Sequence, residues 1–251
     1  FKGKKFHYFG PADGEQACGD IGPGRMIEPS LIADHCATLF SSQALSGLDV
    51  VITAGPTREA IDPVRFISNH SSGKMGYALA EAARDAGARV TIISGPVRLS
   101  APDKVNVIQV DSANDMLSAS LEVQSQCDIF IAAAAVADYR PIQVAQQKIK
   151  KSGEQMQITL IKNPDIVATI AQSENKPFVV GFAAETQDVA TYARGKLTSK
   201  NLNMIIANDV SNAEIGFNSD SNSVTVYWGE SEQEFPRMAK SALAMDLIDL
   251  I

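Results

Sequence analysis

Two short runs decide the fold: residues 48–54 read Leu-Asp-Val-Val-Ile-Thr-Ala, and residues 128–134 read Asp-Ile-Phe-Ile-Ala-Ala-Ala. The first is a β-branched strand pattern that ends at Gly55-Pro56 and leads, after a long connection, into a helix that ends before Gly87. The second is apolar throughout, as expected for a strand buried on both faces at the centre of a parallel sheet.

The same alternation continues along the chain. Further strands are predicted at 90–94, 105–110, 178–182 and 204–207, with helices at 112–126 and 189–200. Strands alternating with helices predict an α/β fold: a doubly wound, Rossmann-like, mostly parallel sheet of about six strands. We also expect two inserted β-hairpins, with strands at 147–151 and 155–160 and at 224–228 and 233–235, and a terminal helix.

The composition changes near Ser46-Gly47. Five glycines fall between residues 10 and 24, and because glycine is costly in regular elements, this run is predicted to be loop. A helix is expected after Pro29. Residues 1–46 are too few for a domain, so they are interpreted as a remnant or linking arm of a longer polypeptide, and 47–251 as the main domain.

Composition excludes several classes of protein. The chain has 251 residues, of which 45% are hydrophobic and 20% charged, which is typical of a globular protein and not of a disordered chain or a disulfide scaffold. A net charge of −7 argues against a nucleic-acid or membrane-surface partner. The longest apolar run, 129–137, is too short to cross a bilayer. Cys18, Cys36 and Cys127 fit no metal spacing, which favours a reducing, cytoplasmic setting.

Ligands of such sheets gather at the carboxyl ends of the strands, which here means loops 55–76, 134–140, 184–186 and 208–209. The first is far longer than the usual βα loop of about 2–6 residues and carries Arg58, Arg65, His70 and Lys74. It opens a helix through Ser71-Ser72-Gly73, whose free N–H groups and positive dipole predict an anion site. It is not a Walker A loop, because Met75 replaces the required Ser or Thr. A solvated loop without function is the alternative.

The second loop, 132–141, begins with four successive alanines. Such small residues let a flat ligand approach the backbone, although packing under a helix explains them equally well. Asp138 follows the strand directly, and an acid there can hold a metal ion or a ribose hydroxyl.

A basic stretch lies in this acidic chain: Arg140, Lys148, Lys150, Lys151 and Lys162 are opposed by Glu154 alone. It indicates either a polyanionic ligand such as a nucleoside triphosphate or an edge strand protected from aggregation. Lys196 and Lys200, four apart on a predicted helix, either reach the same phosphates or are solvated. Cys18, in a glycine loop, is a candidate acid or nucleophile.

Several stretches resemble known enzymes. Residues 17–26, Ala-Cys-Gly-Asp-Ile-Gly-Pro-Gly-Arg-Met, resemble the substrate-clamp motif of phosphopantothenoylcysteine decarboxylases. Similar to phosphopantothenate–cysteine ligases are 53–59, 61–69, 71–76, 135–141, the Lys-Ile-Lys-Lys run at Lys148, 162–166 and 181–186. This order is that of the bacterial bifunctional coenzyme A biosynthesis (CoaBC) family. The resemblance implies that 1–46 are the C-terminal remnant of a flavin-dependent decarboxylase domain with a linker, and that 47–251 are a ligase domain.

The resemblance also implies the chemistry. CTP and the carboxylate of 4′-phosphopantothenate would give an acyl-cytidylate and pyrophosphate, and the amine of L-cysteine would then displace CMP, with Mg²⁺ or Mn²⁺ required. The product would be decarboxylated by an FMN-binding part that is missing here, so no decarboxylase activity is expected from this chain alone. A homodimer through the ligase domain, by way of the inserted hairpins, and a higher oligomer with the full decarboxylase domain are further implications.

Roles follow by the same resemblance. Lys148 would neutralise charge in the first step, Asn69 would hold the acyl-cytidylate, and Arg65 would support its loop or bind the substrate phosphate. Cys18 would be the decarboxylase proton donor, Ala135 would shape the nucleotide pocket, and Asp138 would contact ribose or metal. The candidate substrate- and nucleotide-binding residues are Gly55, Ser71, Ser72, Gly73, Lys74, Ala134, Ala135, Ala137, Asp138, Asn163, Phe182, Lys196 and Lys200.

Two other functions account for part of the sequence. An NAD(P)-dependent oxidoreductase of Rossmann type fits the α/β pattern, but it predicts a compact glycine turn after the first strand and a Tyr-x-x-x-Lys pair, and neither is present. A non-catalytic nucleotide-sensing module explains the basic loops but not the combination of Asn69, Lys148 and Asp138.

Overall fold

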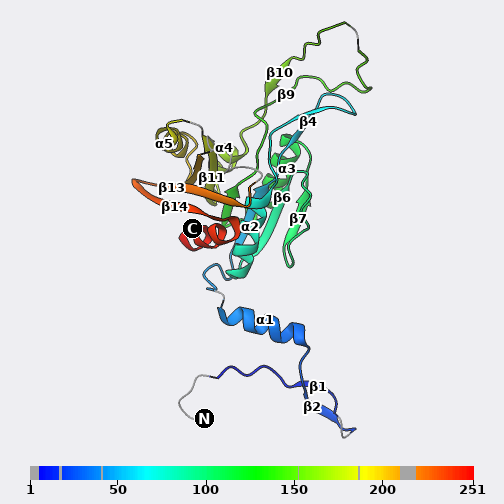
Figure 1. Cartoon of the computed structure of the whole chain (residues 1–251), viewed down its shortest axis with the longest axis vertical. Helices are drawn as coiled ribbons and strands as arrows, with labels where there is room; N and C mark the ends of the chain where they lie inside the picture. The colour runs from blue at the N-terminus through cyan, green and yellow to red at the C-terminus, as the bar shows by residue number, and fades with distance from the viewer. Residues whose placement is uncertain (1–5, 17–18, 41, 152, 186, 210–218) are drawn as a thin grey trace. The chain divides into compact units, whose positions relative to one another are not determined.

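The computed structural model describes residues 6–16, 19–40, 42–151, 153–185, 187–209 and 219–251 and separates into units 1–42 and 43–251 (Figure 1). In the first unit, strands β1 (Ala12–Glu15) and β2 (Ile21–Arg25) form an antiparallel ribbon, followed by helix α1 (Pro29–Phe40). The prediction of loop throughout the glycine run was therefore wrong. The paired backbones satisfy their own hydrogen bonds, and the Gln16 side chain lies where a Cβ on Gly24 would be.

In the described part of the second unit, an eight-stranded sheet has the order β14-β13-β12-β11-β8-β3-β6-β7. Its strands are β3 (Asp49–Ala54), β6 (Arg89–Ser94), β7 (Asn106–Gln109), β8 (Ile129–Ala132), β11 (Phe178–Glu185), β12 (Met204–Asp209), β13 (Ser221–Trp228) and β14 (Ser231–Ala239). From β7 to β12 all pairings are parallel, whereas β13 and β14 are antiparallel. The predicted doubly wound, mostly parallel sheet is confirmed.

Helices cover both faces of this sheet. They are α2 (Lys74–Asp85), α3 (Ala113–Val123, followed by a 3-10 turn at Gln124–Gln126), α4 (Ile166–Ala171), α5 (Val189–Ser199) and α6 (Lys240–Leu250). Ile52 and Ile131 pack in the cluster that includes α2 and α6, whereas their neighbours Val51 and Phe130 pack with α3 and α4. Because successive residues of a strand face opposite sides, the apolar runs at 48–54 and 128–134 supply both layers of the core.

The insertions differ from their predicted form. In the long connection after β3, strands β4 (Arg58–Ala60) and β5 (Phe66–Ser68) pair, which was not predicted. Strands at 147–151 and 155–160 were predicted wrongly: pairing occurs at the base of the segment, between β9 (Tyr139–Pro141) and β10 (Leu160–Lys162). The lysine-rich region between them is largely exposed and buries little apolar surface to hold a longer ladder. The second predicted hairpin is confirmed as β13–β14 and extends the central sheet.

Smaller features of the structure concern the start of α3, Cys36 and Cys127. Ser112 and Asp115 form a reciprocal capping box at the start of α3, and the hydrogen bonds from Ser112 lower the pKa of Asp115. Cys127 is partly buried, and burial raises the pKa of its thiol to about 12, whereas Cys36 is exposed. Among the described helices, none has the length and apolar character that a bilayer crossing requires.

Two helix glycines provide a matched test of packing. A Cβ on Gly76 in α2 would lie 2.6 Å from Cβ of Ala54 in β3, whereas a Cβ on Gly195 in α5 would meet nothing within 4 Å. We expect Gly76→Ala to lower the free energy of unfolding by about 1–3 kcal/mol through overpacking. Gly195→Ala should raise it by up to about 1 kcal/mol through helix propensity. Urea unfolding at pH 7 measures both, and equal effects of the two substitutions would contradict the packing argument.

Candidate active site

The site is organised where β3 and β8 end side by side. The chain after β8 continues along the loop after β3: Ala133 N–H donates to Thr53 O (3.2 Å), and Ala135 N–H donates to Gly55 O (2.8 Å). Two hydroxyls add to this pairing, since Ala134 N–H donates to Thr53 Oγ1 (3.3 Å) and Ala137 N–H to Thr57 Oγ1 (3.0 Å). The alanine loop is thereby fixed at the point where the crossovers from β3 and β8 leave on opposite sides, the usual position for ligands in such sheets.

Two glycines shape the entry to α2. Gly55 and Gly73 have φ of 73° and 76°, in the left-handed region that favours glycine. Gly73 N–H donates to Ser71 Oγ (3.3 Å), and no side chain caps the helix. The first N–H groups of an α-helix have no intrahelical partners. In α2 these groups lie directly after the Ser71-Ser72-Gly73 turn, which the sequence predicts as an anion site.

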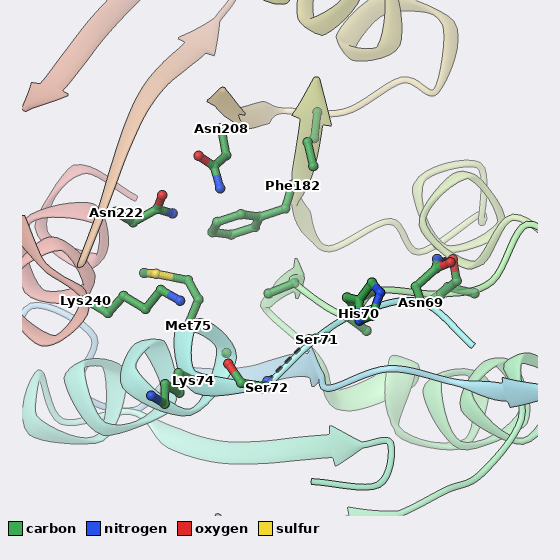
Figure 2. Close-up of a pocket in the computed structure, with 18 of the residues that line it drawn as sticks. Asn69, His70, Ser71, Ser72, Lys74, Met75, Phe182, Asn208, Asn222 and Lys240 are labelled. Atoms are coloured by element: carbon green, nitrogen blue, oxygen red, sulfur yellow. Dashed lines mark hydrogen bonds between the residues drawn. The ribbon is translucent and has the colours of Figure 1, made fainter. Parts of the chain in front are cut away.

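A cavity of about 540 Å³ lies over this turn (Figure 2). The residues lining it come from the loop before α2, the alanine loop, the ends of β11 and β12, and the C-terminal hairpin and helix. They are 69–76, 133–136, Asp138, Phe182, Ala183, Ala184, Asn208, Asn222 and Lys240. Among the predicted site residues, this cavity brings together Asn69, Ser71, Ser72, Gly73, Lys74, Ala134, Ala135, Asp138 and Phe182.

A second cavity, of about 360 Å³, adjoins the first. The two share Ala134, Val136, Asp138 and Phe182 as lining residues. The rest of the second cavity consists of Thr53, Ala132, Ala137, 162–167 and Lys200, which includes the predicted residues Ala137, Asn163 and Lys200. Asp138 and Phe182 therefore stand where two compartments meet.

Amide side chains hold the walls of both compartments. Asn69 Nδ2 donates to Val136 O (2.9 Å), which ties the loop before α2 to the alanine loop. Asn163 Nδ2 donates to Ala137 O (2.7 Å), and its N–H donates to Asp138 O (2.8 Å). Arg140 Nη1 donates to Asn163 Oδ1 (3.0 Å). Asp138 is thus positioned by its backbone while its side chain is exposed.

Charges around the cavities are paired within the protein. Lys74 Nζ lies 2.6 Å from Asp220 Oδ1, and Lys200 Nζ lies 2.8 Å from Asp165 Oδ2. The pairing with Lys74 lowers the pKa of Asp220. Asp165 also caps α4 by accepting from Ala168 N–H (3.1 Å). An anionic ligand would compete with carboxylates for both lysines.

Other predicted residues lie outside these two cavities. Lys148 is exposed on the segment between β9 and β10, and Lys196 lies on α5. Gly55 contributes through its carbonyl, and Arg65 follows β4 in the long connection. Cys18 lies outside the described residues.

Arg65 is bound to Asp62, a residue that the sequence analysis did not select. The buried Asp62 carboxylate accepts from the N–H groups of Val64 and Arg65 (both 2.9 Å) and of Ile149 (3.1 Å). The Arg65 guanidinium donates to it twice (3.0 and 2.6 Å) and also to Ile149 O (3.0 Å). This guanidinium, with the N–H donors, holds the pKa of Asp62 well below its usual value despite burial. The residue next to Lys148 is thus anchored to the loop at 61–65.

Three further residues of the first cavity were missed. Asn208 lies in one of the loops at the carboxyl ends of the strands, where ligands were expected, but it was not among the predicted site residues. Asn222 and Lys240 come from β13 and the start of α6, which no local pattern links to the earlier strands. The turn-forming Asp62-Pro63 pair was a usable signal for Asp62.

A metal ion would find few protein ligands here. Among the described residues, no three His, Cys, Asp or Glu side chains are grouped so that they could hold a metal. Asp138 is the acid shared by both cavities, and Asp165, the other acid of the second cavity, is paired with Lys200. One carboxylate suffices for Mg²⁺ only when a ligand supplies phosphate oxygens, so Asp138 fits a nucleotide-bound ion.

The shift of Asp62 predicts a pH dependence of stability. Since its folded pKa is depressed, its contribution is complete above the unfolded pKa of about 4 and declines as the pH falls below it. Asp62→Asn should therefore unfold at a lower urea concentration than the wild type at pH 7, and this difference should shrink between pH 4 and pH 3. Asp246→Asn, on the exposed side of α6, is the control and should change neither. A constant difference at all pH values would contradict the argument.

Comparison with known proteins shows the family to which the chain belongs. The family described as DNA/pantothenate metabolism flavoprotein C-terminal domain matches residues 45–251. The coenzyme A biosynthesis bifunctional protein CoaBC of Vibrio cholerae is 58% identical over 246 residues, which is 97% of this chain and 62% of that protein. The protein of the same name from Escherichia coli is 50% identical over 248 residues, 97% of this chain and 61% of that protein. The chain thus spans less than two thirds of the length of these relatives.

A solved structure shows the same fold. The crystal structure of the C-terminal domain of a coenzyme A biosynthesis bifunctional protein CoaBC aligns with a TM-score of 0.71 and 43% identity, covering 83% of this chain and 95% of that one. The order of the six parallel strands is that of a Rossmann-like sheet, as predicted. The chain belongs to the family of DNA/pantothenate metabolism flavoprotein C-terminal domains.

Proposed function

We propose that residues 47–251 are a phosphopantothenate–cysteine ligase that uses CTP and acts in coenzyme A biosynthesis. The observation that carries the proposal is the pair of cavities that meet at Asp138 and Phe182. A reaction that joins a nucleotide to a second anionic substrate needs two such compartments with a common wall. The names of the relatives, coenzyme A biosynthesis bifunctional proteins at 50–58% identity, support the choice of reaction.

The chemistry has two steps. A carboxylate oxygen of 4′-phosphopantothenate attacks the α-phosphorus of CTP, a P–O bond forms, and the bond to the β-phosphate breaks to release pyrophosphate. The cysteine amine, having lost a proton, then attacks the acyl carbon of the cytidylate. A C–N bond forms, and the C–O bond breaks to release CMP. Because two anions must meet in the first step, cations around the reacting phosphate lower its barrier.

The residues divide between the compartments accordingly. The second cavity, with Lys162, Asn163 and Lys200, is suited to the nucleotide. Lys196 lies on α5, one helical turn before Lys200, which is the C-cap residue of that helix. Asn69 and the alanine loop are suited to the acyl-cytidylate at the junction. Mg²⁺, brought with the triphosphate and held by Asp138, would supply charge neutralisation there. Lys148 would reach the phosphates from the anchored segment.

Anchoring gives Arg65 a role in this scheme. Through Asp62 and Ile149, Arg65 fixes the segment that carries Lys148. A lysine on an otherwise exposed segment loses conformational entropy when it binds, and two fixed contacts at the adjacent residue reduce that loss. This supports the loop-positioning role for Arg65 over direct binding of the substrate phosphate.

Residues 1–46 belong in our proposal to a decarboxylase domain of a longer protein. There Cys18 would donate a proton during FMN-dependent decarboxylation of the ligase product. The described part of 1–42 is a ribbon and one helix, so the flavin would be held by other parts of such a protein. We place both reactions in the cytoplasm, where CTP and free cysteine are available.

A homodimer is also part of the proposal. The segment from β9 to β10 extends away from the sheet (Figure 1) and exposes large apolar side chains. These are Tyr139, Ile142, Val144, Met156 and Leu160. Apolar patches of this kind mark interaction surfaces. Sedimentation of the wild type against a Val144→Glu, Met156→Glu double variant tests it: a dimer should become a monomer.

Pyrophosphate release tests the ligase. On mixing with CTP, Mg²⁺ and 4′-phosphopantothenate, the wild type should release pyrophosphate once per site, and turnover should begin only when cysteine is added. An oxidoreductase or a nucleotide sensor would release none, and such a result would refute the proposal. Replacing CTP by ATP in the same assay tests the nucleotide preference.

Two substitutions separate the steps. Lys148→Gln should slow the first release of pyrophosphate by about 100-fold or more, because it removes a cation from the developing charge. Asn69→Asp, which places a carboxylate beside the acyl-cytidylate, should reduce cysteine-dependent turnover more than the first release. Lys104→Gln, exposed between β6 and β7, is the control. Unchanged turnover in both variants would overturn these roles.

A further inference from the structure

Two acidic side chains are buried in the described part of the chain, and both belong to one short insertion. Glu59 and Asp62 are 3% and 2% exposed. They lie in the long connection after β3, within residues 57–68, which contain β4 and β5 and which we call the ribbon. Burying an acid is costly, and apolar side chains of similar size often serve stability equally well. Stability alone therefore gives little reason for two such acids in the ribbon.

Glu59 ties the ribbon to the body of the domain. Its Oε1 atom accepts a hydrogen bond from Ala113 N–H (3.0 Å), one of the first N–H groups of α3. Such groups have no intrahelical partner, and the N-terminus of a helix favours an acidic group. The neighbouring Arg58 N–H donates to Asp111 O (2.7 Å). These two contacts hold β4 against the start of α3.

The base of the ribbon is tied to the candidate active site. Thr57 Oγ1 accepts from Ala137 N–H (3.0 Å), in the alanine loop that lines the two cavities. Thr57 O accepts from Ser68 Oγ (2.7 Å), where β5 ends. The Arg58 guanidinium lies 4.7 Å from the centre of the Phe66 ring, across the two strands. The ribbon is thus fixed at its base and stiffened between its strands.

The far end of the ribbon holds the segment between β9 and β10. Ile149 N–H donates to Asp62 Oδ2 (3.1 Å), and the Arg65 guanidinium, which is paired with Asp62, donates to Ile149 O (3.0 Å). Four residues earlier, Ala145 N–H donates to Ile61 O (3.0 Å). At the base of the same segment, β4 packs against β9 (Figure 1). The segment is therefore attached to the ribbon at two points.

We infer that Glu59 and Asp62 are positioning residues for Lys148. The inference rests on the proposed function, in which Lys148 neutralises charge in the first step. Glu59 fixes the ribbon to α3. Asp62 fixes the segment to the ribbon at Ile149, which directly follows Lys148. Neither acid lines either of the two cavities, so both act through the backbone. A displacement of a catalytic group by about 1 Å can slow a reaction about 100-fold, which is why these ties matter.

Asp62→Asn tests the tie between the ribbon and the segment. The amide keeps the size of the side chain but no longer forms an ion pair with Arg65. The first release of pyrophosphate should slow by about 10- to 100-fold. In a Lys148→Gln background, the same substitution should slow it by less than about threefold more, because the residue that Asp62 positions is already lost. Effects that simply multiply would overturn the inference, since a general loss of structure does not depend on Lys148.

Trypsin provides a measurement that needs no activity. It cleaves after lysine, and it requires the chain around the cleaved bond to open locally. The first cut after Lys148, identified by mass spectrometry, should be about tenfold faster in Asp62→Asn than in the wild type, because both hydrogen bonds at Ile149 are weakened. Cleavage after Lys104, exposed between β6 and β7, should not change and is the internal control. Equal rates after Lys148 in the two proteins would overturn the inference.

Glu59 is tested by a matched pair of substitutions. Glu59→Ala removes the acceptor for Ala113 N–H and should slow the first release of pyrophosphate by about tenfold. Glu59→Gln keeps an acceptor and should restore the rate to within about threefold of the wild type. Trypsin cleavage after Lys148 should stay at the wild-type rate in both variants, because the contacts at Ile149 remain. An unchanged release rate in Glu59→Ala would refute the role of Glu59.

Two arrangements keep the outcomes distinct. If Asp62→Asn does not fold, Arg65→Lys replaces it, since lysine retains one ion pair with Asp62 but loses the donation to Ile149 O, and the same faster cleavage after Lys148 is expected. If the wild type releases no pyrophosphate, the proposed function fails, and the catalytic role of the two acids fails with it. Faster cleavage after Lys148 in Asp62→Asn would then still show that Asp62 anchors the segment.

Discussion

The site depends on the backbone pairing between the ends of β3 and β8. Hydrogen bonds from the alanine loop to Thr53, Gly55 and Thr57 continue the parallel pairing of the two strands beyond the sheet. The helices that follow these strands pack on opposite faces, so the chain must diverge here and leave a space. Because the alanines of this loop carry small side chains, they leave room for the two cavities that they line.

The ion pairs in and around the site differ in how easily a ligand could replace the carboxylate. Lys74 is paired with Asp220, Lys200 with Asp165 and Arg65 with Asp62. The first two pairs have a largely exposed or partly exposed carboxylate, so a phosphate can replace it at small cost. The third is different, because the Asp62 side chain is fully buried and accepts several hydrogen bonds. Arg65 therefore has a structural role. Lys74 and Lys200, which lie at the cavities, can exchange their carboxylate partners for a ligand.

Local sequence predicted the framework well because strands buried on both faces have an unmistakable apolar pattern. Residues 48–54 required no tertiary information to be predicted as a strand, and residues 128–134 required none to be placed at the centre of the sheet. Prediction failed where pairing is decided by few apolar contacts. In the segment after β9, β propensity suggested strands at 147–151 and 155–160. The strand pairing forms only between β9 and β10, next to the hydrogen bond from Asn163 N–H to Asp138 O. In residues 10–24, backbone pairing outweighed the cost of glycine.

By itself, the sequence determined the alternation of strands and helices, the loops at the carboxyl ends, and motifs such as Ser71-Ser72-Gly73 that place the start of a helix at one of these loops. Those features are local, since they follow from periodicity and from backbone chemistry within a few residues. Only the tertiary structure placed Lys240 and Asn222 beside Asn208 and tied Ile149 to Asp62. These contacts join residues far apart in the chain, and they arise from the packing of α6 against α2 and from the course of the inserted segment, which no local pattern specifies.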